Sequence, residues 1–401
     1  MKETPPLTDR QKLVLSALQH LDAGRVTVGD VAARINRSTR QVIRLHQAFR
    51  ERGVDAIIHG NANKRPRNAI NVEKAELAVQ LATTKYESFN FSYMAYLLKH
   101  FERLDISEST LRRYLHRAGV KPPTEREAPQ HRSRRPRRRQ AGQLLQMDGS
   151  PHRWFGPDGP EFTLVDGVDD ATNNAQALFR KTEDTEGLFT VLRMVVERWG
   201  IPHAVYTDRG SVFSVNTTYQ IPDDPFFDDP KNTQFGRLCA ELGIRLILAK
   251  SAEAKGRVER FHKTAQGRIP SIARLLGATD IKDAPDVLAM FMRDYRAQFV
   301  VPAADPTPAW LPVPDGLSLD DVFCLKFVRV LSRDYNISFN SVNYQIPKTG
   351  DQSIRPGLRL EVWRLFDGTV KLASGPNVLA VYPKPSTPRL HQRPAAGHPW
   401  R

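Results

Sequence analysis

The first 120 residues carry apolar positions at helical spacing in two successive blocks. In the first block, LTDRQKLVLSALQHL, TVGDVAARI and STRQVIRLHQAFRERG predict three helices. Their N-caps are expected at Thr8, at Thr27 and at Ser38 or Thr39, and Gly53 is expected to end the third helix. A short helix, a tight turn and a longer arginine-rich helix are typical of a helix-turn-helix unit.

The third predicted helix has two different sides. We expect it to pack Val42, Ile43 and Leu45 inward and to present a polar set to solvent. That outward set is Thr39, Arg40, Gln41 and Arg44. A three-helix bundle that binds nothing remains the alternative.

A second block repeats this arrangement. KAELAVQLATTKY, FSYMAYLLKHFERL and ISESTLRRYLHRAGV predict three more helices, the last capped by Ser107 and ended by Gly119. Its exposed side is expected to carry Arg112, Arg113, His116 and Arg117. Two tri-helical units, each ending in an arginine-bearing helix, favour a protein that reads DNA at two places.

Two polar segments flank the second helical block. HGNANKRPRN, between the helical blocks, is typical of an arm that follows a phosphate backbone or enters a minor groove. EREAPQHRSRRPRRRQ has seven arginines between Arg126 and Arg139 and no apolar periodicity. Such a run cannot form a core, and we interpret it as a DNA contact rather than as a solvated linker.

From Gln143 onward the pattern changes from helical spacing to alternating strands and helices. FTLVDGVDDAT, AQALFR, AVYTDRG and IRLILAK predict strands, and EDTEGLFTVLRMVVERWG and TQFGRLCAELG predict helices. This order indicates a layered α/β domain. Near the C-terminus, VFCLKFVRVLSRDYNISFNSVNYQIP and RLEVWRLFDGTVKLAS predict a small all-β barrel, followed by a proline-rich tail that is expected to be disordered.

The net charge of the chain indicates the kind of partner that these domains bind. The chain has 401 residues, with 59 Lys and Arg against 44 Asp and Glu, which gives a formal charge of +15. Such an excess favours a polyanionic partner, most simply nucleic acid. Cys239 and Cys324 are the two cysteines, which excludes a disulfide framework and a cysteine-based zinc site. The sequence shows neither a signal peptide nor a membrane span, and we expect an intracellular protein.

Three acidic residues fall on three different predicted elements. Asp148 in QLLQMDGSPHRWF and Asp208 in AVYTDRGSVF each stand where an apolar strand is expected to end. Glu259 in GRVERFHKTAQGRI lies on a predicted helix. The apolar residues of that helix are Val258, Phe261, Ala265 and Ile269. A lone strand-end acid most often caps a turn, but these three acids can converge above one sheet edge.

Carboxylates that converge need a compensating cation. Two of them about 4 Å apart repel by roughly 4 kcal/mol at an effective dielectric constant near 20. Hard oxygen ligands suit Mg²⁺ or Mn²⁺, and two such ions about 3.5–4 Å apart stabilise the attacking and leaving oxygens of a displacement at phosphorus. The three acids therefore predict metal-dependent phosphoryl transfer.

Several segments together resemble a known family. QMDGSPHRWF with DGVDDAT, then YTDRGSVF, AKGRVERFHKT and the C-terminal DYNISFNSVNYQIP are similar to the DDE transposases of bacterial insertion sequences, which are relatives of retroviral integrases. The resemblance covers essentially the whole chain. It implies helix-turn-helix units, a central RNase H-like α/β catalytic core and a small C-terminal β-barrel.

The resemblance also implies roles for residues. Asp148 would bridge two Mg²⁺ or Mn²⁺ ions, Asp208 would bind one of them and Glu259 the other. The enzyme would bind the element's terminal inverted repeats, cut the element ends and join the freed 3′-OH to target DNA. Lys263 and Gln266, four and seven positions after Glu259 on the same helical face, would contact the terminal DNA.

One departure from the family pattern concerns spacing. Fifty residues separate Asp208 from Glu259, which is longer than the usual interval. The excess falls in SVNTTYQIPDDPFFDDPKNTQ, which we interpret as a lengthened surface loop.

Other polar residues also receive roles. Further DNA contacts are predicted at Arg40, Gln41, Arg44, Lys64, Arg65, Arg67, Arg112, Arg113, Arg117, Arg132, Arg134, Arg135, Arg137, Arg138, Arg139, Lys255 and Arg257. Glu253 is expected to be a solvated acid or to lie at a helix start. His152 and His262 are expected to be structural or solvent-exposed, and Trp154 to pack in the core. Asp166, Asp169 and Asp170 are expected to cap their strand and turn.

These assignments leave alternatives open. A catalytically silent DNA-binding regulator derived from such an enzyme would bind a defined sequence without cutting it. A structure-specific nuclease with the same core would cut DNA and never join it. The intact set of acids argues against the first, and the two helix-turn-helix units argue against the second.

The predicted organisation has eight parts. They are a first helix-turn-helix domain (1–60), a linker (61–70), a second helix-turn-helix domain (71–123), an arginine-rich linker (124–142), the catalytic domain (143–278), a helical and proline-rich connector (279–320), a small β-barrel (321–384) and a tail (385–401). The expected partners are double-stranded DNA and further copies of the chain on that DNA, with no membrane. The expected location is the bacterial cytoplasm, with the nucleoid as the site of action.

Overall fold

The computed structural model describes residues 7–58, 70–124, 135–208, 233–249, 256–347 and 354–384. The chain divides into two compact units, Met1–Lys74 and Ala75–Arg401. Within the described ranges, none of the helices has the length and apolar character needed to cross a membrane.

The first unit contains the three predicted helices, α1 (Asp9–Asp22), α2 (Val28–Ile35) and α3 (Thr39–Arg52), followed by a 3₁₀ turn, η1 (Gly53–Ala56). The predicted N-caps are confirmed, because Thr8, Thr27 and Ser38 each accept a hydrogen bond from the backbone three residues on and form a capping box. The helices share a small apolar core that includes Ala17, Val31, Ile35 and Val42. The tight turn after α2 passes through Asn36 in the left-handed conformation, with φ 50°.

The second unit begins with the other three predicted helices, α4 (Val72–Thr83), which starts just before the division, α5 (Phe91–Phe101) and α6 (Glu108–Arg117). Ser107 caps α6 as predicted. Polar contacts tie α5 to helices much further along the chain. The Tyr93 hydroxyl donates to Asp294 Oδ2 at 2.6 Å, and Asn90 Nδ2 donates to the Gly267 carbonyl at 2.9 Å. These helices are therefore part of the same compact unit as the sheet.

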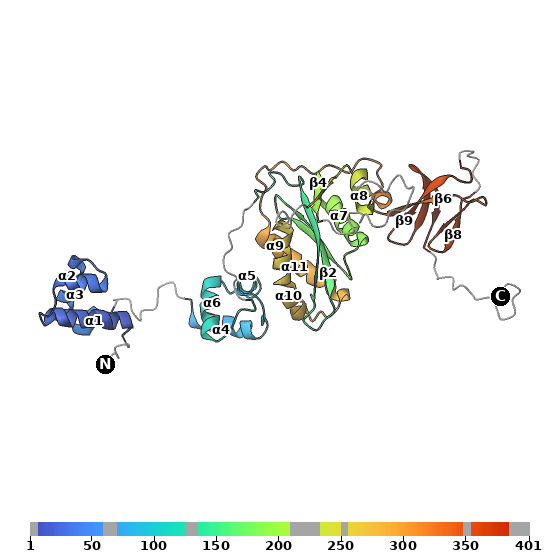
Figure 1. Ribbon diagram of the computed structural model, residues 1–401. Helices are drawn as coiled ribbons and strands as arrows, with labels where there is room; N and C mark the ends of the chain where they lie inside the picture. Colours follow the sequence, from blue (N-terminus) through green and yellow to red (C-terminus); the bar gives the residue numbers. More distant parts are fainter. Residues whose placement is uncertain are drawn as a thin grey trace. The chain divides into compact units, whose positions relative to one another are not determined.

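A five-stranded mixed sheet forms the centre of the second unit (Figure 1). Its strands are β1 (Leu145–His152), β2 (Phe162–Asp169), β3 (Ala175–Arg180), β4 (Ala204–Thr207) and β5 (Arg245–Leu248), in the order β3-β2-β1-β4-β5. The pairs β1–β2 and β2–β3 are antiparallel, whereas β4 is parallel to both β1 and β5. The α/β layer pattern predicted from the sequence is confirmed.

Helices cover both faces of this sheet. One face carries α7 (Thr185–Trp199) and α8 (Gln234–Glu241), and the other carries α9 (Gly256–Gln266), α10 (Ile269–Leu276) and α11 (Ala284–Phe299), with a 3₁₀ turn, η4 (Ile281–Asp283), before α11 (Figure 1). Leu145, Met147 and Val165 are fully buried in one apolar cluster with residues of α7. Because side chains alternate along a strand, the even-numbered residues of β1 and β2 face α9 and α11.

The C-terminal part is built mostly of strands. After a short helix, α12 (Leu319–Val322), it contains β6 (Leu325–Val330), β7 (Asn336–Phe339), β8 (Val342–Gln345), β9 (Arg359–Arg364), β10 (Val370–Ser374) and β11 (Asn377–Tyr382). These strands form one sheet in the order β11-β10-β9-β6 and a separate hairpin, β7-β8, around a shared apolar core. The all-β character predicted from the sequence is confirmed, but the described strands lie in two sheets and do not show the closed barrel.

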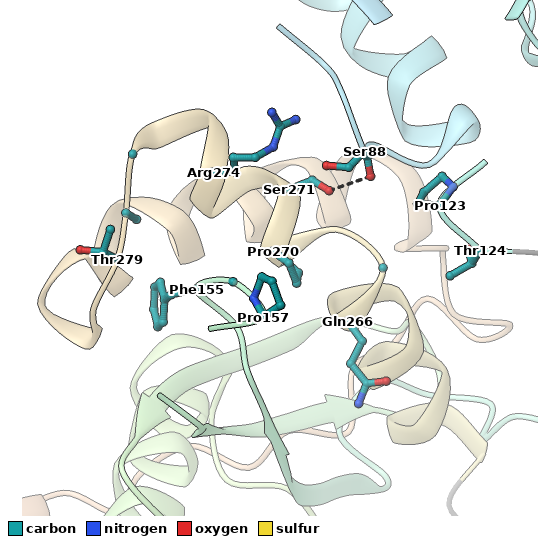
Figure 2. Close-up of a pocket in the computed structure, with 14 residues that line it drawn as sticks. Ser88, Pro123, Thr124, Phe155, Pro157, Gln266, Pro270, Ser271, Arg274 and Thr279 are labelled. Carbon is teal, nitrogen blue, oxygen red and sulfur yellow. Dashed lines mark hydrogen bonds between the residues drawn. The ribbon is translucent and has the colours of Figure 1, made fainter. Parts of the chain in front are cut away.

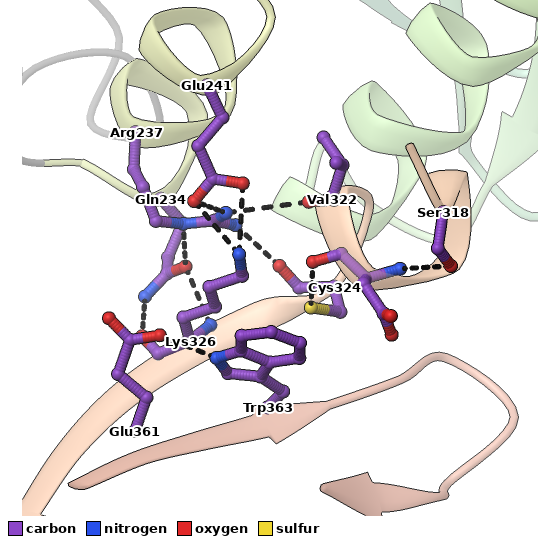
Figure 3. A network of polar contacts seen from close by, with 10 residues as sticks. Gln234, Arg237, Glu241, Ser318, Val322, Cys324, Lys326, Glu361 and Trp363 are labelled. Carbon is purple, nitrogen blue, oxygen red and sulfur yellow. Dashed lines mark hydrogen bonds and ion pairs between the residues drawn. The ribbon is translucent and has the colours of Figure 1, made fainter. Parts of the chain in front are cut away.

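A polar network fixes the C-terminal sheet to α8 (Figure 3). Lys326 Nζ lies 3.0 Å from both carboxylate oxygens of Glu241 and 4.3 Å from the centre of the Trp363 ring. Gln234 exchanges two hydrogen bonds with the backbone of Lys326, and Arg237 donates to the Cys324 carbonyl. The apolar cluster of the central sheet also includes Phe323. The C-terminal strands are thus packed onto the central domain.

This network predicts a measurable contribution of Glu241 to stability. Replacing Glu241 by Ala leaves the ammonium of Lys326, whose side chain is only 12% exposed, without its carboxylate. We expect a loss of about 1–3 kcal/mol in the free energy of unfolding, measured by urea denaturation. Glu197→Ala, which removes a more exposed ion pair with Arg193, is the control and should cost less than about 1 kcal/mol. Equal losses in the two variants would contradict this role.

Candidate catalytic site

Asp148 lies on the central strand of the sheet. The sequence placed it at the end of a strand, but β1 continues to His152, so Asp148 is in its middle. The prediction was wrong because Gly149, Ser150 and Pro151 look like turn residues in the sequence, whereas they pair with β2 in the structure. Asp148 is half-buried and shares its strand face with Gln146 and Ser150.

Asp208 directly follows β4, as the sequence predicted. In the parallel pair of β1 and β4, Leu145 is opposite Val205 and Gln146 is opposite Tyr206. If this register continues for two more residues beyond Gln146 and Tyr206, Asp208 is opposite Asp148. Neighbouring strands are about 4.8 Å apart, so this continued register would place Asp208, just after the end of β4, beside Asp148 in the middle of β1. Residues 209–232, which come next and include the predicted acidic loop, lie outside the described residues.

Glu259 is in the first turn of α9, and that helix packs against β1 and β2. The predicted apolar side is confirmed for Val258, Phe261 and Ala265, which are buried, but Ile269, expected on the same helix, begins α10. Two hydrogen bonds set the helix along β1. The backbone N–H of Val258 donates to Gln146 Oε1 at 3.3 Å, and Gln266 Nε2 donates to Ser150 Oγ at 3.1 Å. Glu259 lies between these two contacts, and Asp148 lies between Gln146 and Ser150.

A hydrogen-bonded pair next to these acids was missed from the sequence. Asp166 is not a turn-capping residue; it is in the middle of β2, directly opposite Asp148. His262 Nε2 donates to Asp166 Oδ2 at 2.5 Å, and the side chains of Asp166 and His262 are 0% and 12% exposed. The sequence signal that could have found the pair is the position of His262, three residues after Glu259 on the same helix.

The neighbouring acids Asp169 and Asp170 have different roles. Asp169 caps its turn as predicted, accepting hydrogen bonds from the N–H and hydroxyl of Thr172 and from the Gly142 N–H. Burial nevertheless raises the pKa of Asp169 above its usual value, and these hydrogen bonds oppose the rise. Asp170 is instead the centre of a buried network, and its side chain caps no turn among the described residues.

The network around Asp170 fixes the end of the arginine-rich segment. Arg135 Nη2 donates to Asp170 Oδ1 at 2.5 Å, and the Arg138 N–H donates to Asp170 Oδ2 at 2.7 Å. Gln146 Nε2 donates to Asp170 Oδ1 at 2.9 Å, while the Oε1 of the same amide holds Val258. A continuous path of hydrogen bonds therefore connects the arginine-rich segment with the first turn of α9.

Other arginines of this region also contact the protein. Arg137 donates to the Ala171 carbonyl at 3.1 Å and to Asn173 Oδ1 at 2.9 Å. Arg257 Nε lies 3.7 Å from Asp170 Oδ1, and burial, together with the charge of Arg137, lowers the pKa of Arg257. Arg138 and Arg139 are exposed. The DNA contacts predicted for these residues remain predictions, and the exposed pair is the better placed for them.

The side of α3 that was predicted to face solvent is largely exposed in the structure. Arg40, Gln41 and Arg44 are exposed, and Gln41 also accepts a hydrogen bond from the Ser38 N–H in the capping box. Ile43 was expected to pack, but it is 56% exposed because it lies between Arg40 and Arg44 on the outward face. Helical spacing explains the exposure of Ile43, since its neighbour Val42 already occupies the inward position.

On α6, Arg113, His116 and Arg117 are exposed as predicted. Arg112 is half-buried, because its guanidinium pairs with Glu108 at 2.8 Å and lies 5.4 Å from the centre of the Phe91 ring. The other residues predicted to contact DNA lie outside the described residues, and they are Lys64, Arg65, Arg67, Arg132, Arg134 and Lys255.

Two aromatic residues near the site, Trp154 and His152, make contacts that stabilise the fold. Trp154 is fully buried, as predicted, and its Nε1 donates to the Phe162 carbonyl at 2.8 Å. The His152 ring lies 5.0 Å from that of Trp154, and burial lowers the pKa of His152. Neither residue is brought into contact with the three acids by a described hydrogen bond.

A cavity of about 530 Å³ lies beyond the end of α9 (Figure 2). Its lining includes Ser88 before α5, Phe155 and Pro157 of the β1–β2 turn, and Pro270 and Arg274 of α10. Gln266, which also lines it, points toward the sheet, where it contacts Ser150. The cavity thus adjoins the face that carries Asp148.

The chemistry of these donors suits a divalent metal ion. Among the described residues, no three His, Cys, Asp or Glu side chains are gathered closely enough to hold a metal ion. The donors nevertheless suit Mg²⁺ or Mn²⁺, because they are carboxylates, the continued register of β1 and β4 brings Asp208 beside Asp148, and α9 is fixed along the same face. Oδ2 of the neighbouring Asp166 is bonded to His262, and Asp148, Asp208 and Glu259, the three acids singled out in the sequence, are the residues that would hold the ion.

Comparisons with known proteins agree with this architecture. Residues 14–73 match the family model described as winged helix-turn helix. The transposase for insertion sequence IS1202 of Streptococcus pneumoniae is 30% identical over 325 residues, which cover 72% of this chain and 68% of that protein. The protein named as transposase y4bF of Sinorhizobium fredii is 31% identical over 341 residues, covering 83% and 72%. The chain belongs to the insertion-sequence transposases.

Solved structures give a weaker likeness. The catalytic core domain of HTLV-2 integrase in complex with magnesium is 13% identical, covers 39% of this chain and 85% of that chain, and has a TM-score of 0.29. The intasome of simian T-cell lymphotropic virus in complex with PP2A regulatory subunit B56 gamma is 14% identical, covers 76% and 95%, and has a TM-score of 0.31. Scores this low do not fix the fold, which rests on the strand order of the sheet itself.

Membership of the transposases settles the broad activity. A transposase transfers DNA strands, so the chain is a polynucleotidyl transferase, and α1–α3 form its DNA-binding helix-turn-helix domain. The resemblance inferred from the sequence is confirmed at this level. The catalytic residues and the metal dependence of the reaction are matters of proposal.

Proposed function

We propose that this transposase binds the terminal inverted repeats of its insertion sequence, cleaves the element ends and joins the resulting 3′-OH to target DNA, with Asp148, Asp208 and Glu259 as catalytic residues. One observation carries this proposal. The parallel register of β1 and β4, continued by two residues, puts Asp208 beside Asp148, and α9 is fixed along the same face of β1 with Glu259 between its two contacts to that strand.

In this mechanism the protein holds the three carboxylates in fixed positions and orientations. Two Mg²⁺ or Mn²⁺ ions, when bound, supply the positive charge that stabilises the attacking and leaving oxygens at phosphorus. Asp148 and Asp208 present carboxylate oxygens from a sheet whose positions are fixed by its ladder of hydrogen bonds. Glu259 presents its carboxylate from α9, whose apolar side is buried and which packs against β1 and β2. The fixed scaffold keeps the three carboxylates oriented while DNA is bound.

DNA would be held by elements on either side of these acids. We infer that α3 reads a terminal sequence with Arg40 and Arg44, and that the exposed residues of α6 contact a second stretch. Lys263, exposed and four residues after Glu259, would hold a phosphate next to the site. Because each active site must act on a defined DNA end, we propose that two or more copies of the chain assemble on paired ends.

The test of this function is an assay with the element's own ends. DNA carrying the inverted repeats that flank the gene is incubated with the protein and Mg²⁺, and both cleavage at the element end and joining to target DNA are measured. Wild type should do both, and Asp208→Asn should do neither while still binding the DNA. Wild-type activity in Asp208→Asn would rule out the assigned site. Cleavage without joining would identify a nuclease instead.

The salt dependence of binding separates the arginines that contact DNA from those that contact the protein. Each neutralised phosphate contributes about −0.9 to the slope of log K against log salt. Replacing the exposed Arg138 and Arg139 by Ala should flatten that slope by about 2. Arg137→Ala, whose guanidinium is bonded to the Ala171 carbonyl and Asn173, should leave the slope within about 0.5 of wild type. An unchanged slope in the double variant would show that these arginines are only a linker.

A further inference from the structure

Helix α9 is attached to the sheet by three polar contacts in a row. The Val258 N–H reaches Gln146 at 3.3 Å, His262 Nε2 reaches Asp166 at 2.5 Å, and Gln266 reaches Ser150 at 3.1 Å. Their acceptors all lie on one face of β1 and β2, the face that also carries Asp148. The middle contact is the shortest, and its acceptor is fully buried. Glu259 lies between the first contact and the middle one.

The apolar side of α9 does not determine this alignment by itself. Val258, Phe261 and Ala265 are buried, and the Phe261 ring packs edge-on against those of Phe291 and Tyr295 in α11. Apolar burial is non-directional, so it holds the helix on the sheet without fixing its rotation. A hydrogen bond is directional, so one made from the same side of the helix as Glu259 can fix the rotation of α9. His262, three residues further, is on that side.

The position of Asp166 gives the contact a second consequence. Asp148 and Asp166 are cross-strand partners on the same face, where Cβ atoms are about 4.5–5.5 Å apart. Like charges at such positions repel each other, and Asp166 offers the same hard oxygens as the acids beside it. Its bond to His262 directs one carboxylate oxygen toward α9. Asp166 is thereby engaged by the helix that presents Glu259.

We propose that Asp166 and His262 form a positioning pair for catalysis: their hydrogen bond sets the rotation of α9 so that Glu259 is turned toward Asp148 and Asp208, and it holds one of the two Asp166 carboxylate oxygens, Oδ2, on α9. This proposal rests on the proposed function for its catalytic consequence, because Glu259 matters only if it belongs to the site. The alignment of α9 itself does not depend on any reaction.

The experiment compares three variants with wild type. His262→Ala removes the contact, and His262→Gln restores a donor, because the Gln Nε2 extends about as far as the imidazole Nε2. Thr264→Ala is the matched control on the same helix, since the Thr264 hydroxyl bonds only the Arg260 carbonyl of α9 among the described contacts. Two quantities are measured: hydrogen exchange of the α9 amides without DNA or metal, and the kcat and KM of end cleavage with Mg²⁺.

In His262→Ala we expect α9 amides to exchange at least about tenfold faster and kcat to fall about 10–100-fold, with KM for DNA within about twofold, because a misplacement of about 1 Å costs on this scale. His262→Gln should recover most of both losses, and Thr264→Ala should match wild type. A residue needed only for folding would not give rescue by Gln with a loss confined to kcat. If His262→Ala does not fold, His262→Asn, whose shorter side chain does not reach Asp166, replaces it.

The two readouts keep the proposals separable. Unchanged α9 exchange in His262→Ala overturns the positioning pair, whatever the cleavage rate. Loss of activity in His262→Gln equal to that in His262→Ala also overturns it, because the hydrogen bond would then not be the cause. If wild type itself does not cleave, the proposed function fails, and the exchange data still decide whether the pair aligns α9.

Discussion

Replacing Glu259 by Gln is expected to reduce end cleavage and strand transfer on the order of 10³-fold or more, while DNA binding persists. Gln has nearly the shape of Glu but lacks the negative charge that a divalent ion requires. Val258, Phe261 and Ala265 continue to hold α9 on the sheet, since their burial does not depend on position 259. The loss should therefore appear in kcat and not in the affinity for DNA.

The matched control for Glu259 is the other glutamate of the same stretch. Glu253 was interpreted from the sequence as a solvated or helix-start acid, and it lies outside the described residues. Glu253→Gln makes the same chemical change six positions earlier and should keep activity within about threefold of wild type. Cleavage by gel assay and DNA affinity by fluorescence anisotropy measure the two effects. Comparable losses in both variants would show that charge along the stretch, and not one metal ligand, is what the reaction needs.

Asp170→Ala is expected to lower the free energy of unfolding by about 3–5 kcal/mol. Asp170 is fully buried and receives hydrogen bonds from Arg135, from the Arg138 N–H and from Gln146. Removing the carboxylate leaves several donors unsatisfied at once, including the buried amide of Gln146. Because the other end of that amide holds Val258, the substitution should also loosen the first turn of α9.

Urea denaturation followed by circular dichroism measures this loss. Asp105→Ala is a suitable control, because Asp105 also pairs with a cation, Lys99, at 3.2 Å, but the two side chains are 80% and 56% exposed. Such a surface pair contributes less than about 1 kcal/mol. If Asp170→Ala were as stable as Asp105→Ala, the network between the arginine-rich segment and α9 would have no energetic role.

The local structure of this chain was predictable wherever short-range chemistry decides it. Helix starts at Thr8, Thr27, Ser38 and Ser107 follow from side chains that satisfy backbone N–H groups, and each was found. The apolar side of α9 follows from helical spacing alone. The strands of the central sheet were recognised from buried apolar runs, and the family was recognised from the segments around Asp148, Asp208 and Glu259.

The features that could not be predicted depend on contacts between distant segments. That Asp148 lies in mid-strand depends on the pairing of Gly149 to His152 with β2, which their turn-like composition conceals. Asp166 meets His262 across 96 positions of sequence, and Asp170 meets Arg135 across 35. Periodicity shows which face of an element is buried, but it does not show which partner covers a polar residue. For the same reason the sequence assigned Arg135 and Arg137 to DNA alone.

The most direct test of the central claim is whether one metal site contains all three acids. Fe²⁺ replaces Mg²⁺ in the DNA-bound protein, and ascorbate with peroxide then generates hydroxyl radicals that cut the backbone next to the bound ion. We predict cuts near residues 148, 208 and 259 together, competed away by excess Mg²⁺ and all lost in Asp148→Asn. Cuts at only one of these positions, or cuts that persist in Asp148→Asn, would contradict a shared site.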